Sequence, residues 1–205
     1  MKPLPRLYAI ADASFGDPVQ LAESLFHGGA RLLQVRNKNA SALELLRQVE
    51  EILSFAPPDA DVIVNDRVDV ALVSKAAGVH LGQADLAPVE ARRILGANRI
   101  IGRSTHNLEQ ALEANQQPVD YVAIGPIFAT RTKENPDPIV GVEKLAGICR
   151  AIQKPVVAIG GIQLENVASV LRTGVQSVAV IRDVLAARDI QGRVADWIQT
   201  LDVIA

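Results

Sequence analysis

The chain has 205 residues, of which 49% are hydrophobic and 21% are charged, a balance typical of an ordinary globular domain. Its formal net charge of -2 excludes a general attraction to nucleic acid or to an anionic membrane, so we expect neither as a partner. The lone cysteine, Cys149, excludes an intramolecular disulfide. No apolar run is long enough to cross a bilayer or to act as a signal peptide, and we therefore expect a cytoplasmic protein.

Short apolar runs recur at regular intervals from the first residues to the last. Most of them are continuous in Val, Ile, Leu and Ala, which is typical of strands that are buried on both faces of a parallel sheet. The predicted strands are residues 7–12, 31–36, 61–66, 78–82, 100–105, 121–126, 155–160 and 177–182.

A segment with helical spacing follows each predicted strand. In the first, residues 17–29, Asp17 is the expected N-cap and Pro18 opens the first turn. In the second, residues 41–55, the helical spacing places Leu43, Leu45, Leu46, Val49 and Leu53 largely on one face. The remaining helical segments are residues 67–77, 86–95, 107–115, 141–152, 164–174 and 182–201.

Eight strand-and-helix units in one chain predict a (β/α)8 TIM barrel that forms a single domain, residues 1–205. A doubly wound open sheet also alternates strand and helix, so periodicity alone leaves it as the alternative. The one long connection is residues 127–141, between the sixth strand and its helix. Long loops are often functional, and we interpret this one as a candidate lid.

Two acids end neighbouring predicted strands, Asp66 in "VIVND" and Asp85 in "VHLGQAD". Barrels carry their chemistry at the C-terminal ends of their strands, and two carboxylates there can reach one Mg²⁺ ion. Taken singly, each acid could equally be the N-cap of the helix that follows it. The pair is therefore a candidate metal site whose alternative is helix capping.

Cations, hydroxyls and glycines occupy the other strand ends. Arg36, Lys38 and Lys133 could neutralise a phosphorylated ligand, and Ser104, Thr130 and Thr132 add hydroxyl donors; none of these is diagnostic alone. The "GGI" turn after the seventh strand and the turn after the eighth offer backbone N–H groups, at the usual phosphate site of barrels. The sequence thus predicts two anionic groups, one beside a metal and one beside the last two strands.

An ordered series of motifs carries a resemblance to a known family. The motifs are "QVRNK", "VIVNDRVDVAL", "GVHLGQAD", "IGRSTH", "DYVAIGPIFATRTK" and "PVVAIGGI". With them the chain resembles the thiamine-phosphate synthases over nearly its whole length. The resemblance implies a (β/α)8 barrel and a transferase of thiamine biosynthesis. Its reaction would join hydroxymethylpyrimidine diphosphate to a thiazole phosphate, or its carboxylated form, by a dissociative Mg²⁺-assisted substitution that releases pyrophosphate.

The resemblance also implies roles for individual residues. Mg²⁺ would be bound by Asp66 and Asp85, and the catalytic residues would be Arg36, Lys38, Ser104 and Lys133. Contacts to the pyrimidine diphosphate are implied for Gln34, Val35, Arg36, Asn37, Lys38, Asn65, Ser104 and Lys133. Contacts to the thiazole phosphate are implied for Thr130, Thr132, Gly161, Ile181 and Arg182. The family usually has serine where this chain has Arg182, so the resemblance leaves the role of that side chain open.

Three alternatives remain at this level. The thiazole tautomerase branch of the superfamily uses a histidine near the end of the sixth strand, where this chain has Pro126, and it loses parts of the acid pair. A sugar-phosphate isomerase or aldolase would need a base or a lysine inside the barrel, and no predicted strand contains a lysine. A non-catalytic sensor of thiamine precursors would bind the same small molecules without turnover. A homodimer could form through the outer helices, although no sequence feature identifies an interface.

Overall fold

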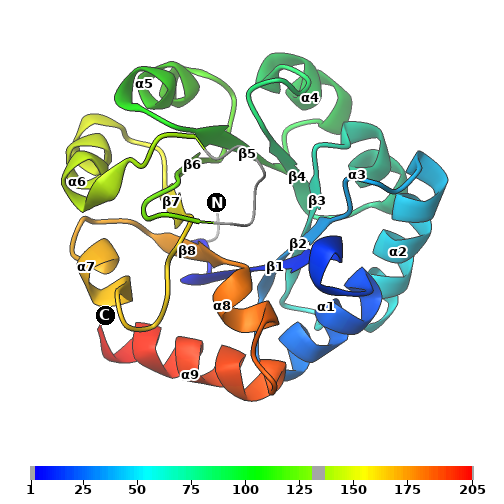
Figure 1. Ribbon diagram of the computed structural model, residues 1–205. Helices are drawn as coiled ribbons and strands as arrows, with labels where there is room; N and C mark the ends of the chain where they lie inside the picture. Colours follow the sequence, from blue (N-terminus) through cyan, green and yellow to red (C-terminus); the bar gives the residue numbers. More distant parts are fainter. Residues whose placement is uncertain (1–2, 131–136, 205) are drawn as a thin grey trace.

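The computed structural model describes residues 3–130 and 137–204. Its parallel strands form one closed barrel in which each strand pairs with its neighbours in chain order and β8 pairs with β1 (Figure 1). The strands are β1 (Leu7–Asp12), β2 (Leu32–Arg36), β3 (Asp61–Asn65), β4 (Gly78–Leu81), β5 (Ile100–Thr105), β6 (Tyr121–Ile124), β7 (Val156–Ile159) and β8 (Ser177–Val180). The predicted single-domain (β/α)8 barrel is thereby confirmed, and the open sheet is excluded.

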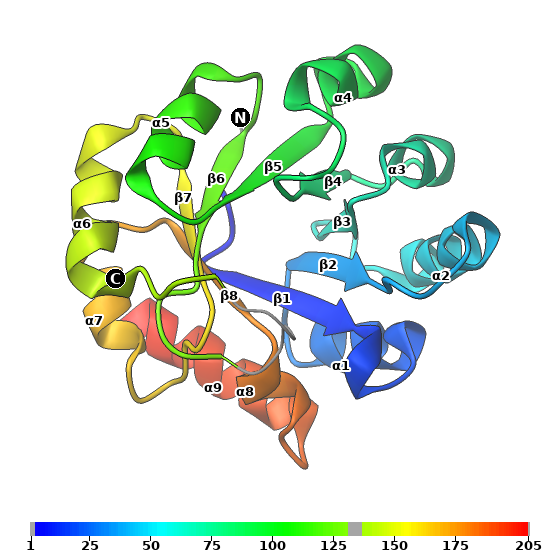
Figure 2. The ribbon, with the colours of Figure 1, turned by 45° about the horizontal axis from the view of Figure 1, so that its top comes forward.

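The helices form a ring outside the strands, as the two views of the ribbon show (Figure 2). They are η1 (Ala13–Phe15), α1 (Pro18–His27), α2 (Ala42–Phe55), α3 (Val68–Ser74), α4 (Pro88–Leu95), α5 (Leu108–Gln116), α6 (Gly141–Ala151), α7 (Val167–Leu171), α8 (Arg182–Leu185) and α9 (Ile190–Val203). The prediction of one helix over residues 182–201 is wrong. Helix α8 ends at Leu185, and α9 begins at Ile190. The Asp189 side chain caps α9 by accepting a hydrogen bond from the Gly192 N–H, one of the amides in the first turn that have no partner within the helix. In the part of the chain that is described, no helix has the length and apolar character needed to cross a membrane.

Two apolar clusters hold the barrel together because successive side chains of a strand point to opposite faces. On β1, Leu7 and Ala9 join the large cluster between the strands and the helices, whereas Tyr8 and Ile10 join the cluster inside the barrel. When both faces of a strand are buried, neither face needs polar side chains, and polar and apolar residues do not alternate along the strand. This explains the continuous apolar sequences. Each large aliphatic side chain buried in these layers contributes about 1.5–3 kcal/mol to folding.

The apolar face of α2 is narrower than predicted. Leu45, Val49 and Ile52 are buried against the barrel, and Leu46 and Leu53 pack at the edge of this cluster. Leu43, which the spacing assigns to the same face, is 56% exposed. Leu43 lies in the first turn of the helix, before the face that packs on the strands.

Candidate active site

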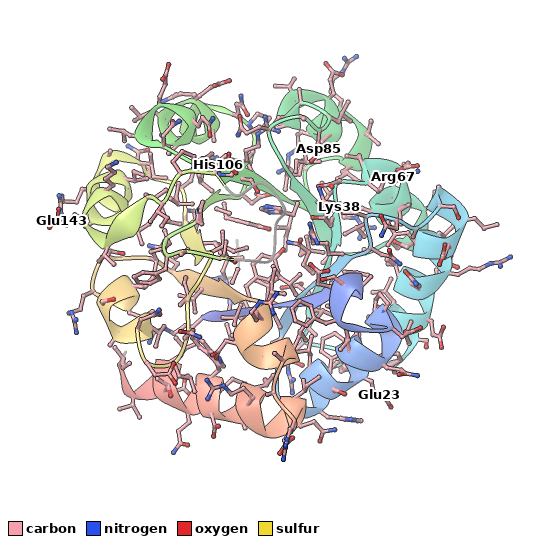
Figure 3. The ribbon with its side chains drawn as sticks, in the orientation of Figure 1. Glu23, Lys38, Arg67, Asp85, His106 and Glu143 are labelled. Carbon is pink, nitrogen blue, oxygen red and sulfur yellow. The ribbon has the colours of Figure 1, made fainter. Side chains whose placement is uncertain are left out.

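A cavity of about 500 Å³ opens at the C-terminal ends of the strands. This volume lies in the range of small-molecule sites, and the position is the one at which barrels carry their active sites. Lys38, Asp85 and His106 lie around its mouth, whereas Glu23 and Glu143 lie on the outside of the helical ring (Figure 3).

The two predicted metal-binding acids both line this cavity. Asp66 has a positive φ of 61° and donates its backbone N–H to the His80 carbonyl oxygen at 2.8 Å. The Asp85 carboxylate turns back to accept the Gly82 N–H at 2.6 Å. The N-cap residues of the following helices, α3 and α4, are Arg67 and Ala87, and neither makes a side-chain cap hydrogen bond. Capping, the alternative explanation of these acids, is therefore wrong.

Electrostatics sets Asp66 and Asp85 apart from ordinary surface acids. Burial raises the pKa of Asp66, and the neighbouring Asp85 carboxylate raises it further, whereas the Lys38 ammonium, 3.4 Å away, lowers it. Two carboxylates thus share a partly buried position with one close cation. Within the described residues, no group of three or more His, Cys, Asp or Glu side chains could hold a metal. A two-carboxylate set fits Mg²⁺, which usually binds one or two protein acids and completes its shell with water and phosphate oxygens.

Arg36 is held at the cavity wall by a buried acid that the sequence analysis missed. Its guanidinium Nη1 donates to Asp12 Oδ2 at 2.5 Å, and Asp12 is 1% exposed. The other carboxylate oxygen of Asp12 accepts the Ser14 N–H at 2.9 Å and the Ser14 hydroxyl at 2.7 Å. Because Ser14 holds one oxygen of the Asp12 carboxylate and Arg36 binds the other, the Arg36 guanidinium is held in one orientation before any ligand binds.

A second missed residue, Arg103, supports the turn that carries Asp85. Its guanidinium donates to the Gly82 carbonyl at 2.6 Å and lies 3.5 Å from the Gln83 carbonyl oxygen. Burial lowers the pKa of Arg103, and the charge of Asp85 opposes that shift. Arg103 therefore holds the turn that leads to Asp85, and it is not one of the residues that line the cavity.

The opposite wall of the cavity is built on glycines. Gly160 and Gly161 have φ values of 99° and 67°, and a Cβ on Gly161 would lie 2.6 Å from the Ala129 carbonyl oxygen. Only glycine allows both this conformation and this close approach. The turn lies against the loop segment that leads to Thr130, because the Phe128 N–H donates to the Gly160 carbonyl oxygen at 2.9 Å.

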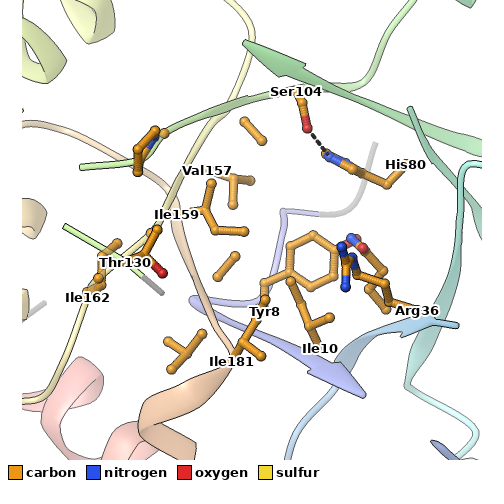
Figure 4. A pocket seen from close by; sticks show the side chains of 18 of the residues that line it. Tyr8, Ile10, Arg36, His80, Ser104, Thr130, Val157, Ile159, Ile162 and Ile181 are labelled. Atoms are coloured by element: carbon orange, nitrogen blue, oxygen red, sulfur yellow. Dashed lines mark hydrogen bonds between the residues drawn. The ribbon is translucent and has the colours of Figure 1, made fainter. Parts of the chain in front are cut away.

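The close-up shows the two walls facing each other across open space, with Arg36, Tyr8 and Ile10 on one side and Thr130 and Ile162 on the other (Figure 4). Arg182 begins α8, and its guanidinium lies 5.2 Å from the centre of the Phe15 ring. This cation–π contact draws an exposed side chain toward η1.

Most of the predicted site residues come together at this cavity. Those that line it are Gln34, Arg36, Lys38, Asn65, Asp66, Asp85, Ser104, Thr130, Gly161, Ile181 and Arg182. The Val35 side chain does not line the cavity, because it points outward into the core between strands and helices. Asn37 also points away, and its amide donates to Gln48 at 3.2 Å. Thr132 and Lys133 lie outside the described residues.

Three aromatic residues inside the barrel were also missed as a group. Tyr8, His80 and Tyr121 form a hydrogen-bonded cluster in the barrel interior. Each is a polar residue within an otherwise apolar strand, in "LYAIAD", "GVHLG" and "YVAIGP". That interruption is the sequence signal that could have identified them.

Comparison with known proteins agrees with the geometry. A family model described as thiamine monophosphate synthase matches residues 7–184. A thiamine-phosphate synthase of Koribacter versatilis (strain Ellin345) is 47% identical, over 97% of this chain and 96% of its own length. One of Anaeromyxobacter dehalogenans (strain 2CP-C) is 48% identical over 89% and 82%. The structure of a thiamine phosphate pyrophosphorylase from Pyrococcus furiosus matches with a TM-score of 0.89 and 36% identity, over 97% of this chain and 96% of that one. The chain belongs to the thiamine monophosphate synthase family.

Proposed function

We propose that this chain is a thiamine-phosphate synthase that couples an aminopyrimidine methyl diphosphate to a thiazole phosphate and releases pyrophosphate. One observation carries the proposal. A single cavity of about 500 Å³ has an acid pair with two cations at one wall and a glycine-rich turn at the other. Two anionic substrates can therefore be held at once, with the room between them left for the atoms that react.

The diphosphate would lie at the wall formed by Arg36, Lys38 and Ser104. The two cations would neutralise its charge, and the hydroxyl of Ser104 would donate to one of its oxygens. Asp66 and Asp85 would hold Mg²⁺, which when bound supplies further charge stabilisation to the departing pyrophosphate. Lys133, which the family resemblance assigns to the same group, lies outside the described residues.

The apolar lining of the cavity suits the pyrimidine ring and the proposed dissociative path. Ile10, Val157 and Ile159 supply this lining. An electron-rich aminopyrimidine can support positive charge on its methylene carbon once pyrophosphate departs. Apolar side chains around that carbon would keep out water, which would otherwise capture the cation before the thiazole nitrogen does. The protein then needs no nucleophile of its own, and the orientation of the two substrates supplies much of the acceleration.

The thiazole phosphate would lie at the opposite wall, on Thr130, Gly161 and the turn at Ile181. We assign the Arg182 contact to its backbone N–H, because its guanidinium stacks on Phe15. An Arg182→Ala variant should therefore raise KM for the thiazole phosphate less than about threefold, whereas loss of a charge-assisted hydrogen bond would raise it tenfold or more. A tenfold rise would show that the guanidinium itself binds the phosphate.

The deciding experiment measures pyrophosphate release with both substrates and Mg²⁺. The wild-type protein should turn over, and Asp85→Asn should lower turnover at least about 100-fold, since a mispositioned metal–diphosphate complex loses its charge stabilisation. Glu143→Gln, an acid on the outside of the ring, is the matched control and should retain wild-type turnover. Full activity of Asp85→Asn at saturating Mg²⁺ would contradict the assignment. Binding of both substrates without any pyrophosphate release would identify a sensor instead of an enzyme.

A further inference from the structure

A continuous chain of hydrogen bonds crosses the barrel interior and ends at Ser104. Gln34 Nε2 donates to Tyr8 Oη at 3.0 Å, and Tyr8 Oη lies 2.9 Å from Tyr121 Oη. Tyr121 Oη lies 2.8 Å from His80 Nδ1, and His80 Nε2 lies 2.8 Å from Ser104 Oγ. The last of these contacts is drawn in Figure 4. Five strands supply one residue each, so the chain is fixed by the barrel itself.

The barrel makes room for this chain at one position in particular. Gly102 pairs with Tyr121 across β5 and β6, and a Cβ on Gly102 would lie 2.0 Å from the tyrosine ring. The His80 ring stacks on that of Tyr121 with 5.6 Å between centroids and 18° between planes. Tyr121 is fully buried and is not one of the residues that line the cavity. Tyr121 can therefore act on a ligand only through its neighbours, and two of these, His80 and Tyr8, line the cavity.

Each member of the chain has few hydrogens to give, so the direction of one bond sets the next. Burial raises the pKa of both Tyr8 and Tyr121, so each keeps its single hydroxyl hydrogen. Tyr8 accepts from the amide of Gln34; its contact with Tyr121 fixes no donor by itself, and we take Tyr8 as the donor. With Tyr8 as the donor, Tyr121 donates in turn to His80 Nδ1, which leaves the hydrogen of a neutral imidazole on Nε2. That hydrogen goes to Ser104 Oγ.

The consequence falls on the hydroxyl of Ser104. When Ser104 Oγ accepts from His80, its own hydrogen is available to an acceptor in the cavity. The opposite direction would have Ser104 donating to His80, and it would offer the cavity only a lone pair. Phosphate oxygens accept hydrogen bonds and do not donate them, so only the first direction suits the proposed diphosphate.

We infer that Tyr121 is a positioning residue that fixes His80 as the Nε2–H tautomer and thereby holds Ser104 as a hydrogen-bond donor toward the diphosphate. The second half of this inference depends on the proposed function, whereas the tautomer of His80 does not. Ser104 touches the ligand, and Tyr121 and His80 act through it.

The tautomer is measured directly on protein labelled with ¹⁵N in its histidine rings. His80 should show a hydrogen on Nε2 and none on Nδ1. His106 gives an opposite reference in the same spectrum, because its Nδ1 lies 2.6 Å from the Gly125 carbonyl oxygen and must donate to it. In Tyr121→Phe the His80 signals should become those of a mixture of tautomers. A hydrogen on Nδ1 of His80 in the wild-type protein would overturn the inference, whatever the protein catalyses.

The kinetic test is a double-mutant cycle between Tyr121 and Ser104. Tyr121→Phe should lower kcat about tenfold and change KM for the pyrimidine diphosphate less than about threefold, because a misdirected donor costs less than the ~100-fold of a lost one. In a Ser104→Ala background, the same substitution should lower kcat less than about twofold, since its effect passes through Ser104.

The matched control is Ser177→Ala, which removes another fully buried hydroxyl. That hydroxyl lies away from the cavity and donates to the Arg6 carbonyl oxygen at a distance of 3.2 Å. Its kcat should stay within about twofold of wild type. An equal loss from Tyr121→Phe in both backgrounds would show a merely structural role and overturn the inference. If the wild-type protein released no pyrophosphate at all, the proposed function would fail, and the tautomer measurement would still decide the state of His80.

Discussion

Asp12→Asn tests whether the buried ion pair at the end of β1 both stabilises the fold and orients Arg36. Asparagine keeps an oxygen for Ser14, but it loses the charge-assisted hydrogen bond to the guanidinium. Breaking a buried ion pair costs about 3–5 kcal/mol, and the 18% exposure of the Arg36 side chain lets water replace part of what is lost. We therefore expect unfolding free energy to fall by about 2–3 kcal/mol, close to the value of a hydrogen bond to a charged group.

Urea unfolding followed by circular dichroism measures that loss, and steady-state kinetics measures its effect on binding. KM for the pyrimidine diphosphate should rise about fivefold, because a loosened guanidinium pays more entropy when it binds. Asp59→Asn is the control: its ion pair with Arg31 has a separation of 3.0 Å, and the two side chains are 38% and 66% exposed. Such a pair contributes less than about 1 kcal/mol. Equal losses from the two variants would refute the argument that burial gives the Asp12 pair its strength.

Three further predictions concern the acid pair and the glycine turn. Burial and Asp85 raise the pKa of Asp66 above 3.8 in the folded protein. The charged Asp66 carboxylate therefore destabilises the folded state at pH values above the raised pKa, and this destabilisation disappears below pH 3.8. Asp66→Asn should thus raise the melting temperature at pH 7 without metal, with a gain that vanishes toward pH 3; a gain that grows on acidification would contradict this. Arg103→Met should weaken Mg²⁺ binding about tenfold in calorimetry while the fold persists, and unchanged affinity would exclude a positioning role. Gly161→Ala should lower stability by at least ~1–2 kcal/mol, whereas Gly147→Ala, in open space on α6, should raise it by about 0.5–1 kcal/mol; similar shifts in denaturant midpoint would refute the strain argument.

The barrel itself could be predicted because strands buried on both faces leave a simple record of apolar runs separated by amphipathic helices. The boundary that failed lies in the segment 182–201, where the apolar pattern continues while the helix does not. Asp189 is a local start signal, because its side chain caps the new helix, and it outweighs the pattern there. Periodicity reports which face is buried, and it does not report where a helix is interrupted.

Within the site, most predicted residues lie at or near the strand ends; Asp12, which ends β1, and the two tyrosines inside the barrel were not predicted. Gln34 and Arg36 are two positions apart and share the inward face, and the same spacing places Val35 on the outward face. That parity is readable once one inward residue is known. Tyr8 and Tyr121, by contrast, meet only when the barrel closes, because they are 113 positions apart in the chain. No local pattern encodes such a contact.

The close fit between Gly102 and the ring of Tyr121 also restricts the order in which substitutions at these two positions can arise during evolution. Any side chain at position 102 collides with the tyrosine, so a substitution there is tolerated only after position 121 has become smaller. A smaller residue at position 121, however, removes the hydroxyl that reaches His80. A lineage that first acquires a smaller residue at position 121 therefore loses the contact that positions Ser104, before any side chain can be added at position 102. The two positions should therefore be inherited together wherever the reaction is kept.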